Sequence, residues 1–338
     1  MLLNLPNIKN GDTKMIKFSL YLKATFAVIG LIAHIAASAQ EYPNRPIKIV
    51  VSFPAGSGSD IYTRIIAEDF RIEMNQSFVV ENRAGASGQI GSAYVAKSAP
   101  DGYTLLMTSN TAHAANPSLF KKLPYDPVAD FTGIGRVLYM PYLLVVSKNS
   151  PITSVKDLIE RARTKPNSLN YAYGNSSAQV LSAAFGRQAQ IISVAIPYKS
   201  VPSALTDLIG GSVDYAFSDV STVMPLLQAG NIRAIGFSLL QRSPQLPNVP
   251  SIAETQGMEG FELTSWVGLV APAGTPENIV NKINAQLRKT LAKPQVRDKL
   301  IGMGAEVVPS SPIEMDDFIK QQLVNWGTKI RAAGILPE

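Results

Sequence analysis

The residues best suited to bind a ligand lie in one short loop, FPAGSGSD, from Phe53 to Asp60. The loop follows an apolar run and precedes a predicted helix, whose first N–H groups have no partner within the helix. Gly56 and Gly58 allow a ligand to come close to the backbone, and Ser59 or Asp60 can cap the helix. Such a helix start favours binding of a carboxylate or a phosphate, although an ordinary strand-to-helix turn has the same residue types.

The loop does not match the common nucleotide-binding motifs. No Gly-Lys-Ser/Thr follows it, so a P-loop is excluded, and a dinucleotide fingerprint would need Gly where Ile61 stands. The loop residues kept as candidate ligand contacts are Phe53, Ala55, Gly56, Ser57, Gly58, Ser59 and Asp60.

Similar polar turns follow predicted strands further along the chain. Each turn alone is explained by helix capping, but their shared position after strands predicts a polar pocket with hydrogen-bond donors on two walls. The candidate residues in these turns are Ser109, Asn110, Thr111, Gly174, Asn175, Ser176, Ser177, Tyr198 and Asp219.

The composition restricts the chemistry that the chain can perform. Cysteine is absent, and the two histidines are His34 and His113, so a multi-histidine metal site or a thiolate site is not expected. A Ser-His-Asp triad could use only His113, and no nucleophile elbow or obvious catalytic carboxylate pair is present. The enzyme alternative is therefore a secreted serine-type hydrolase that uses His113, and no cofactor or metal is expected.

The N-terminus has the layout of a secretory signal peptide. Three lysines within residues 14–23 precede the apolar run Ala24–Ala37, and Ala37–Ala39 is a small-x-small cleavage site. A retained membrane anchor is the alternative, but the run is short for a membrane span. Either Met1 or Met15 is the true start.

Removal of residues 1–39 lowers the charge of the chain. The full sequence carries +6, and the mature chain keeps 27 basic and 24 acidic residues, a net charge of +3. It has no basic run, so nucleic acid is not an expected partner. A signal peptide on a chain without cysteine is compatible with a bacterial periplasm and argues against a lipoprotein.

Strand-like and helix-like segments alternate along the mature chain, which predicts an α/β fold with mainly parallel sheets covered by helices. The predicted helices include about Ser59–Met74, Ser87–Lys97, Val155–Thr164, Ser176–Gln188, Val201–Ile209 and Ser221–Ala229. Two strand-like segments break the rhythm, Tyr142–Lys148 and Thr264–Pro272, and bracket about 120 residues of regular alternation. This layout predicts a discontinuous first lobe (residues 40–143 and 266–338), an inserted second lobe (144–265), and a ligand site between them.

Several stretches resemble the Bug family, the periplasmic solute receptors of tripartite tricarboxylate transporters. They extend from Tyr42 to the C-terminal helix: YPNRPIKIVVSFPAGSGSD, VVENRAGASGQIGSAYVAKSAPDGYTLL, LPYDPVADF, IPYKSVPSALTDLIGGSVDYAF, RSPQLPNVPSIAE and GLVAPAGTP. The order of APDGYTLL and APAGTP makes the match specific.

The resemblance implies a type II periplasmic binding fold whose two lobes, joined by two crossover strands, close on a small carboxylate. A dicarboxylate, a tricarboxylate, an aromatic acid or an acidic amino acid would fit, for delivery by a monomeric receptor to the membrane subunits of the transporter. The resemblance places Phe53–Asp60 and Ser109–Thr111 on one wall, and Gly174–Ser177, Tyr198 and Asp219 on the other.

The chain departs from the family pattern at positions that concern the ligand. Ala55 and Ser57 replace a Pro and a Gly of the usual first loop, Ser218-Asp219 replaces the usual Asp-Asn pair, and Ser200 replaces the Gly of the usual Lys-Gly. These departures leave the expected fold unchanged and the ligand open.

Export should remove the first 39 residues, because the charged, apolar and small-residue segments follow the order that signal peptidase requires. Mass spectrometry of the protein purified from the periplasm should give a chain that begins at Gln40. An intact mass that retains residues 24–37 would contradict cleavage.

Overall fold

The computed structural model describes residues 42–338, so the predicted signal peptide lies outside the described residues. Residues 45–338 form one compact unit, to which all the elements below belong. The strands are β1 (Ile47–Val51), β2 (Phe78–Asn82), β3 (Thr104–Ser109), β4 (Phe131–Ser147), β5 (Asn170–Tyr173), β6 (Val194–Pro197), β7 (Tyr215–Asp219), β8 (Ile232–Phe237), β9 (Thr264–Pro272) and β10 (Glu306–Val307).

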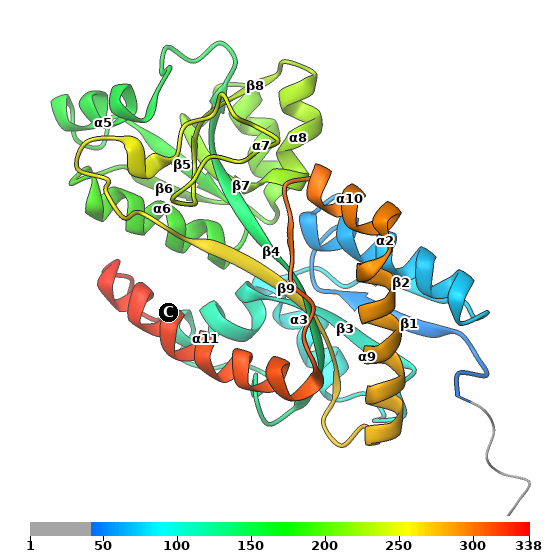
Figure 1. Cartoon of the computed structure of the whole chain (residues 1–338). Coiled ribbons are helices and arrows are strands. Elements are labelled where there is room, and N and C mark those ends of the chain that lie inside the picture. Colours follow the sequence, from blue (N-terminus) through cyan, green and yellow to red (C-terminus); the bar gives the residue numbers. More distant parts are fainter. Residues whose placement is uncertain (1–41) are drawn as a thin grey trace, which may run out of the picture. The chain divides into compact units, whose positions relative to one another are not determined.

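The helices cover both faces of the sheets (Figure 1). They are α2 (Gly58–Glu73), α3 (Gln89–Ala96), α4 (Asn116–Leu119), α5 (Val155–Thr164), α6 (Ser176–Gln188), α7 (Val201–Ile209), α8 (Val220–Gln228), α9 (Glu277–Ala292), α10 (Pro294–Gly302) and α11 (Pro312–Ala332). Short 3₁₀ turns occur at η1 (Ala86–Gly88) and η3 (Ile252–Glu254), and η2 (Thr111–Ala115) is a π-helical turn.

The first lobe is built on the parallel strands β2-β1-β3. In β1, Ile47, Ile49, Val50 and Val51 are fully buried, as expected for a strand covered on both faces. Strand β9 then pairs antiparallel with β3, so that Ser109 lies opposite Val267. This register brings the polar end of β3 beside the middle of β9.

The strands β4 and β9 run between the two lobes (Figure 1). They pair antiparallel from Phe131–Pro272 to Pro141–Thr264, and β4 then continues into the second lobe to pair with β7 and β8. The crossover at Thr264–Pro272 has the predicted bounds. The other crossover is longer than predicted, because the segment from Tyr142 covers only the last six residues of a 17-residue strand.

The second lobe has a parallel core β7-β5-β6, with β7 and β8 both antiparallel to β4. Helices α5, α6 and α7 have the predicted bounds. Helix α8 begins one residue earlier than predicted, at Val220, because Asp219 caps it. Helix α3 begins at Gln89, two residues after the predicted start, because Ala86–Gly88 form the separate 3₁₀ turn.

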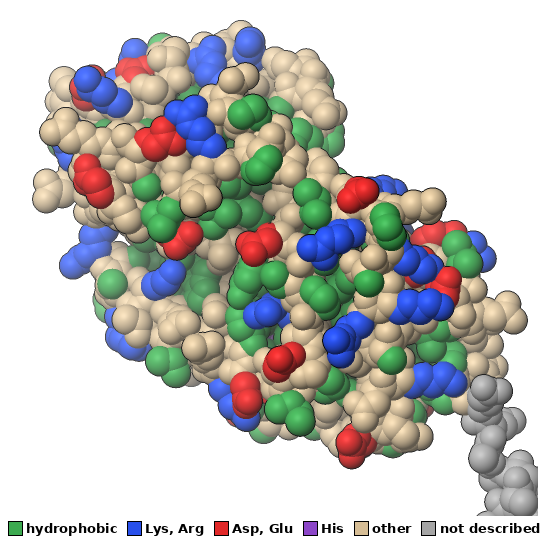
Figure 2. Space-filling view, in the orientation of Figure 1, with side chains coloured by type: hydrophobic (Ala, Val, Ile, Leu, Met, Phe, Trp, Pro, Cys, Tyr) green, Lys and Arg blue, Asp and Glu red, His purple; other side chains and the backbone are tan. Residues whose placement is uncertain are grey.

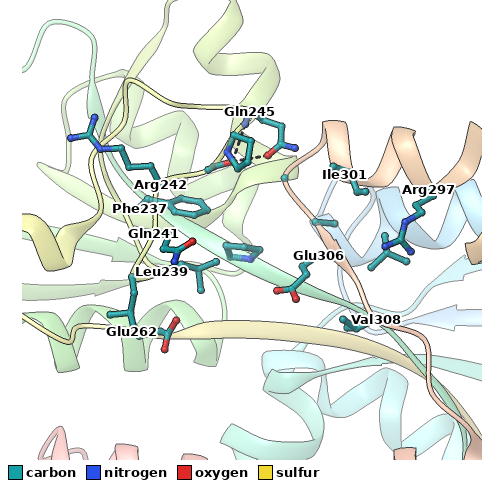
Figure 3. A pocket seen from close by; sticks show the side chains of 17 residues that line it. Phe237, Leu239, Gln241, Arg242, Gln245, Glu262, Arg297, Ile301, Glu306 and Val308 are labelled. Atoms are coloured by element: carbon teal, nitrogen blue, oxygen red, sulfur yellow. Dashed lines mark hydrogen bonds between the residues drawn. The ribbon is translucent and has the colours of Figure 1, made fainter. Parts of the chain in front are cut away.

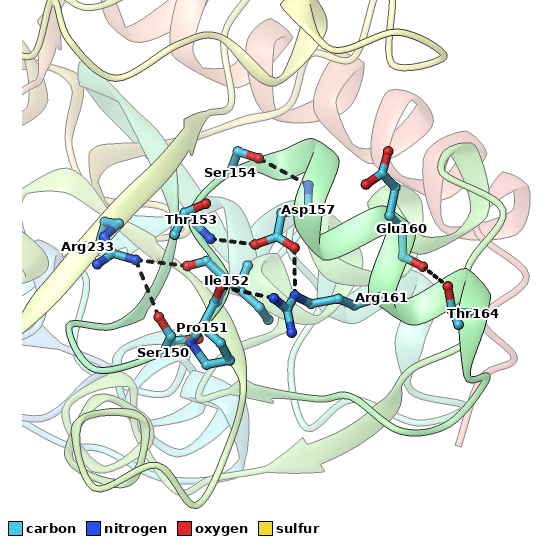
Figure 4. Close-up of polar contacts among 10 residues, drawn as sticks. All are labelled: Ser150, Pro151, Ile152, Thr153, Ser154, Asp157, Glu160, Arg161, Thr164 and Arg233. Atoms are coloured by element: carbon cyan, nitrogen blue, oxygen red, sulfur yellow. Dashed lines mark hydrogen bonds and ion pairs between the residues drawn. The ribbon is translucent and has the colours of Figure 1, made fainter.

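The start of α5 shows how the sequence sets a helix boundary (Figure 4). Ser154 accepts the N–H of Asp157 at 3.1 Å, and the Asp157 carboxylate accepts the N–H of Thr153 at 2.9 Å. Arg161 donates to Asp157 at 2.6 Å, and Arg233 of β8 donates to the carbonyl of Ile152 at 3.0 Å. These contacts fix the helix start to the neighbouring strand.

The surface carries charges of both signs, interspersed on the face shown in Figure 2. Helices α2 and α9 lie side by side, where Lys293 bridges Asp69 and Glu73 at 2.6 Å to each. Among the described residues, no helix combines the length and the apolar character needed to cross a membrane.

His113 is a core residue of the first lobe. Its Nδ1 lies 2.5 Å from the Thr108 hydroxyl, and its ring packs edge-on against Phe131 at 4.6 Å between centroids. Its Nε2 has no hydrogen-bond partner among the described residues, so no serine is paired with it there. Burial lowers the pKa of His113 to about 3, which keeps the imidazole neutral.

His113 should therefore make the fold sensitive to acid. The unfolded chain takes up a proton near pH 6.5 and the folded chain only near pH 3, so stability should fall as the pH drops between these values. The loss is at most about 1.4 kcal/mol per pH unit. Between pH 7 and pH 5, the free energy of unfolding of His113→Gln should fall by about 2 kcal/mol less than that of the parent. Urea unfolding at the two pH values measures this difference. Equal losses in the two proteins would contradict this.

Candidate ligand-binding site

A small cavity lies where helix N-termini from the two lobes meet. Its walls are close together, and only about 20 Å³ is open to the centre of a water molecule, room for about one water. The residues that line the cavity are Phe53, Pro54, Ser57, Gly58, Ser59, Ser109, Thr111, Met140, Tyr142, Asn175, Val201, Asp219 and Ser265.

Half of the predicted site residues line this cavity, and they come from both predicted walls. They are Phe53, Ser57, Gly58, Ser59, Ser109, Thr111, Asn175 and Asp219. The other predicted residues, which lie around the cavity or away from it, are Ala55, Gly56, Asp60, Asn110, Gly174, Ser176, Ser177 and Tyr198.

The opening loop offers fewer free N–H groups than the sequence predicted. The cap of α2 is Ser57, not Ser59 or Asp60. Asp60 accepts the N–H of Gly56 at 3.0 Å, and its own N–H donates to the Ser57 hydroxyl at 3.4 Å. The N–H groups of Gly58 and Ser59, in the first turn of α2, have no partner among the described residues. These two donors are therefore the ones that the loop presents to the cavity.

Asp60 stabilises the loop through hydrogen bonds made by its carboxylate. Its carboxylate accepts hydrogen bonds from Arg64 at 3.0 Å and from Asn82 at 2.9 Å, and Asn82 also donates to the carbonyl of Phe53 at 2.9 Å. Burial by itself would raise the pKa of Asp60, but the hydrogen bonds from Arg64, Gly56 and Asn82 outweigh it and hold the pKa below its usual value. Asp60 is thus paired and does not line the cavity.

Gly58 lies where the two walls touch. A Cβ at this position would lie 2.5 Å from Oδ1 of Asp219 and 2.9 Å from the sulfur of Met140. Real Cβ atoms do not approach a neighbour so closely. Any larger residue at position 58 would therefore require the side chains of Asp219 and Met140 to shift.

Three helices of the second lobe begin at the cavity, facing the start of α2. Asn175 caps α6 by accepting the N–H of Ala178 at 2.8 Å, and Asp219 caps α8 by accepting that of Thr222 at 3.0 Å. Val201, the first residue of α7, also lines the cavity. Lys, Arg and His are missing from the described lining residues, so the positive potential there comes from helix N-termini.

Direct hydrogen bonds join the two walls beside the cavity. Asn110 donates to the Ser177 hydroxyl at 3.0 Å, and the Thr111 hydroxyl lies 3.0 Å from the same oxygen. Ser176 donates to Asn116 at 2.7 Å. The predicted site residues Asn110, Ser176 and Ser177 therefore hold the lobes together in this structure.

Two predicted residues of the second wall have other roles in this structure. Gly174 packs against the peptide between Ser200 and Val201, where a Cβ would lie 2.1 Å from the carbonyl carbon of Ser200. Tyr198 is half-buried and donates its hydroxyl to Asp207 at 2.8 Å.

The lining residues outside the predicted walls are Met140, Tyr142, Val201 and Ser265, and Pro54 lies in the predicted loop Phe53–Asp60 without having been kept as a candidate contact. Met140, Tyr142 and Ser265 belong to the crossover strands, which line the cavity between the walls. The two predicted crossover segments could have indicated these residues, because strands that join two lobes must pass the cleft between the lobes. Burial, together with the nearby charge of Asp219, raises the pKa of Tyr142.

A larger cavity of about 750 Å³ lies elsewhere, between the chain after β8 and the α10–β10 region (Figure 3). Phe237, Leu239, Ile301 and Val308 give it an apolar lining, and none of the predicted site residues reaches it. The small cavity remains the better candidate, because unpartnered N–H groups and helix starts converge there.

Comparison with known proteins agrees with this geometry. Residues 62–335 match the family model described as tripartite tricarboxylate transporter family receptor. Protein BugT of Bordetella pertussis is 34% identical over 316 residues, covering 91% of this chain and 97% of BugT.

Solved structures of similar proteins share the fold. Rpa4515 of R. palustris with adipate is 35% identical with a TM-score of 0.86, covering 88% of this chain and 100% of that one. The periplasmic binding protein BugD is 30% identical with a TM-score of 0.83, covering 88% and 100%. MatC of Rhodopseudomonas palustris with bound malate is 30% identical with a TM-score of 0.80, covering 86% and 100%.

These matches confirm the predicted type II periplasmic binding fold, with two lobes joined by two crossover strands. They also confirm the resemblance to the Bug proteins. The chain therefore belongs to the family of tripartite tricarboxylate transporter receptors.

Proposed function

We propose that this protein captures a small carboxylate in the periplasm and delivers it to a tripartite tricarboxylate transporter. The observation that carries the proposal is the cavity at which α2, α6, α7 and α8 all begin, with no cationic side chain among the described residues that line it. Structures of the similar proteins Rpa4515 and MatC hold adipate and malate, which supports a carboxylate as the ligand class.

The N–H groups of Gly58 and Ser59 would bind the carboxylate. Among the described residues they have no partner, and they lie at the positive end of a 16-residue helix, where an anion gains from both hydrogen bonds and the helix dipole. The hydroxyl of Ser109 is buried, lines the cavity and has no partner among the described residues, so it would supply a further contact. Binding of this kind needs no covalent step, and the proposed role is that of a receptor and not of an enzyme.

Substitutions at Ser59 test the backbone donors. Ser59→Pro removes the N–H at a position in the first helical turn, where proline is tolerated. A charge-assisted hydrogen bond contributes about 1.5–3 kcal/mol, so the variant should bind carboxylates at least about tenfold more weakly. Calorimetry with the best ligand from a thermal-shift screen of organic acids measures the change. In that screen, a ligand at a hundred times its Kd should add about 2.7 kcal/mol of stability.

Ser59→Ala is the matched control, because it keeps the N–H and removes only the hydroxyl. It should bind within about threefold of the parent. Equal affinity of the folded Ser59→Pro variant and the parent would show that the carboxylate lies elsewhere. A screen in which no carboxylate binds the parent would contradict the proposed function itself.

We further propose that the lobes, with boundaries near residues 143/144 and 265/266, separate to admit the ligand, since the walls touch and leave room for about one water. Small-angle scattering should therefore show a smaller radius of gyration with ligand than without. Thr111→Cys/Ser177→Cys, whose hydroxyl oxygens lie 3.0 Å apart in the parent and whose chain has no other cysteine, should give a closed reference when oxidised. An identical radius for the free, ligand-bound and oxidised proteins would argue against hinge opening.

A further inference from the structure

Asp219 is the only carboxylate among the described residues that line the cavity, and no Lys, Arg or His lines it. This inference rests on the proposed function, which places an anion in the cavity. The second lobe presents a negative charge, that of Asp219, to the same space. A second charge of the same sign in a confined site is repelled unless the ligand brings its own positive group.

The side chain of Asp219 is buried and held in place on one side only. Its Oδ1 accepts hydrogen bonds from the Ser221 hydroxyl at 2.6 Å and from the N–H and hydroxyl of Thr222 at 3.0 and 2.8 Å. For Oδ2 there is no hydrogen-bond partner among the described residues, and none of the described cations forms a salt bridge with this carboxylate. Oδ2 is therefore the atom through which this carboxylate can accept a hydrogen bond from a ligand, and a cationic donor makes the strongest such bond.

The position of Asp219 places this charge opposite the proposed carboxylate donors. Its Oδ1 contacts the wall at Gly58, next to the free N–H groups of Gly58 and Ser59. The cavity thus offers hydrogen-bond donors on one wall and an anion on the other. The buried hydroxyl of Ser109, in the lining, is also without a partner among the described residues. A ligand that satisfies these groups has a carboxylate and a cationic nitrogen close together.

We infer that Asp219 selects for a ligand with a cationic nitrogen, so that this receptor prefers ammonium carboxylates, such as α-amino acids, to plain dicarboxylates. Capping of α8 alone would explain why residue 219 is polar, but asparagine and serine cap helices as well as aspartate does. The charge can therefore be removed while the cap is kept, which makes the inference testable.

The experiment is calorimetry with matched ligand pairs that differ only in the amine: L-aspartate and succinate, L-glutamate and glutarate, L-phenylalanine and 3-phenylpropanoate. The parent should bind the amino member of at least one pair at least tenfold more tightly than its partner. Asp219→Asn should lose at least tenfold of that affinity, and it should bind the partner without the amine as well as the parent does or better.

Asp214→Asn is the control, because it removes a carboxylate of the same lobe outside the cavity, where Asp214 accepts the N–H of Asn170 at 2.7 Å. This variant should bind the amino member of each pair, and the partner without the amine, as tightly as the parent does. If Asp219→Asn does not fold, Asp219→Ser replaces it, since the serine hydroxyl also caps a helix.

Two outcomes separate the inference from the function on which it rests. Tight binding of a plain carboxylate by the parent, with no preference for its amino counterpart, would overturn the role of Asp219 and leave the receptor function standing. Retention of the amine preference in the folded Asp219→Asn variant would overturn it as well. If the parent binds neither member of any pair, nor any acid in the wider screen, the proposed carboxylate receptor function fails first.

Discussion

The antiparallel pairing of β4 with β9 holds both walls of the cavity in place. Backbone hydrogen bonds join the two strands from Phe131 to Pro141, and β4 continues from there into the second lobe. Because β3 pairs with the far side of β9, the polar end of β3 at Ser109 is set by the same ladder. On the other lobe, Tyr142 pairs with Asp219, which fixes the start of α8. A shift of this register by one residue would turn every side chain of the crossover to the opposite face.

In the proposed function, the site built on this ladder binds a carboxylate with backbone groups instead of cationic side chains. Helix starts supply partial positive charges that cost no side-chain entropy and do not depend on pH. In this proposal, the rest of the ligand, including its second functional group, contacts uncharged hydroxyls such as that of Ser109, and Asp219.

The sequence predicted the fold well where local signals were strong. Asn175 and Ser200 cap helices that begin at the predicted positions, because capping residues followed by apolar periodicity define a helix start without tertiary information. The part of β4 before Tyr142 was not predicted, and Gly133 and Gly135 within it weaken any strand pattern. Those glycines are needed because α9 and α11 pack closely on the strand: a Cβ would lie 2.6 Å from Asp316 and 2.9 Å from Asn284. Such contacts join residues about 150 or more positions apart, and no local pattern records them.

The prediction of the site was limited in a similar way. Ser57, Ser59 and Asp60 are all good capping residues, and the choice of Ser57 depends on the Asp60 contacts with Arg64 and Asn82. The local sequence also gives no sign that Asn110 bonds with Ser177, across the cleft.

If the protein delivers its ligand to a transporter, as proposed, the hydrogen bonds between Ser177 and its partners Asn110 and Thr111 have a consequence for the kinetics of transport. They close the lobes with the protein's own side chains, so an unloaded molecule can present to the membrane subunits the same closed outline as a loaded one. The apparent Kd then equals the intrinsic Kd divided by the fraction of molecules that are open. Each closed, unloaded molecule is also a competitor for the transporter, and its docking is futile. The strength of these few side-chain bonds therefore sets a balance between rapid loading and wasted encounters at the membrane.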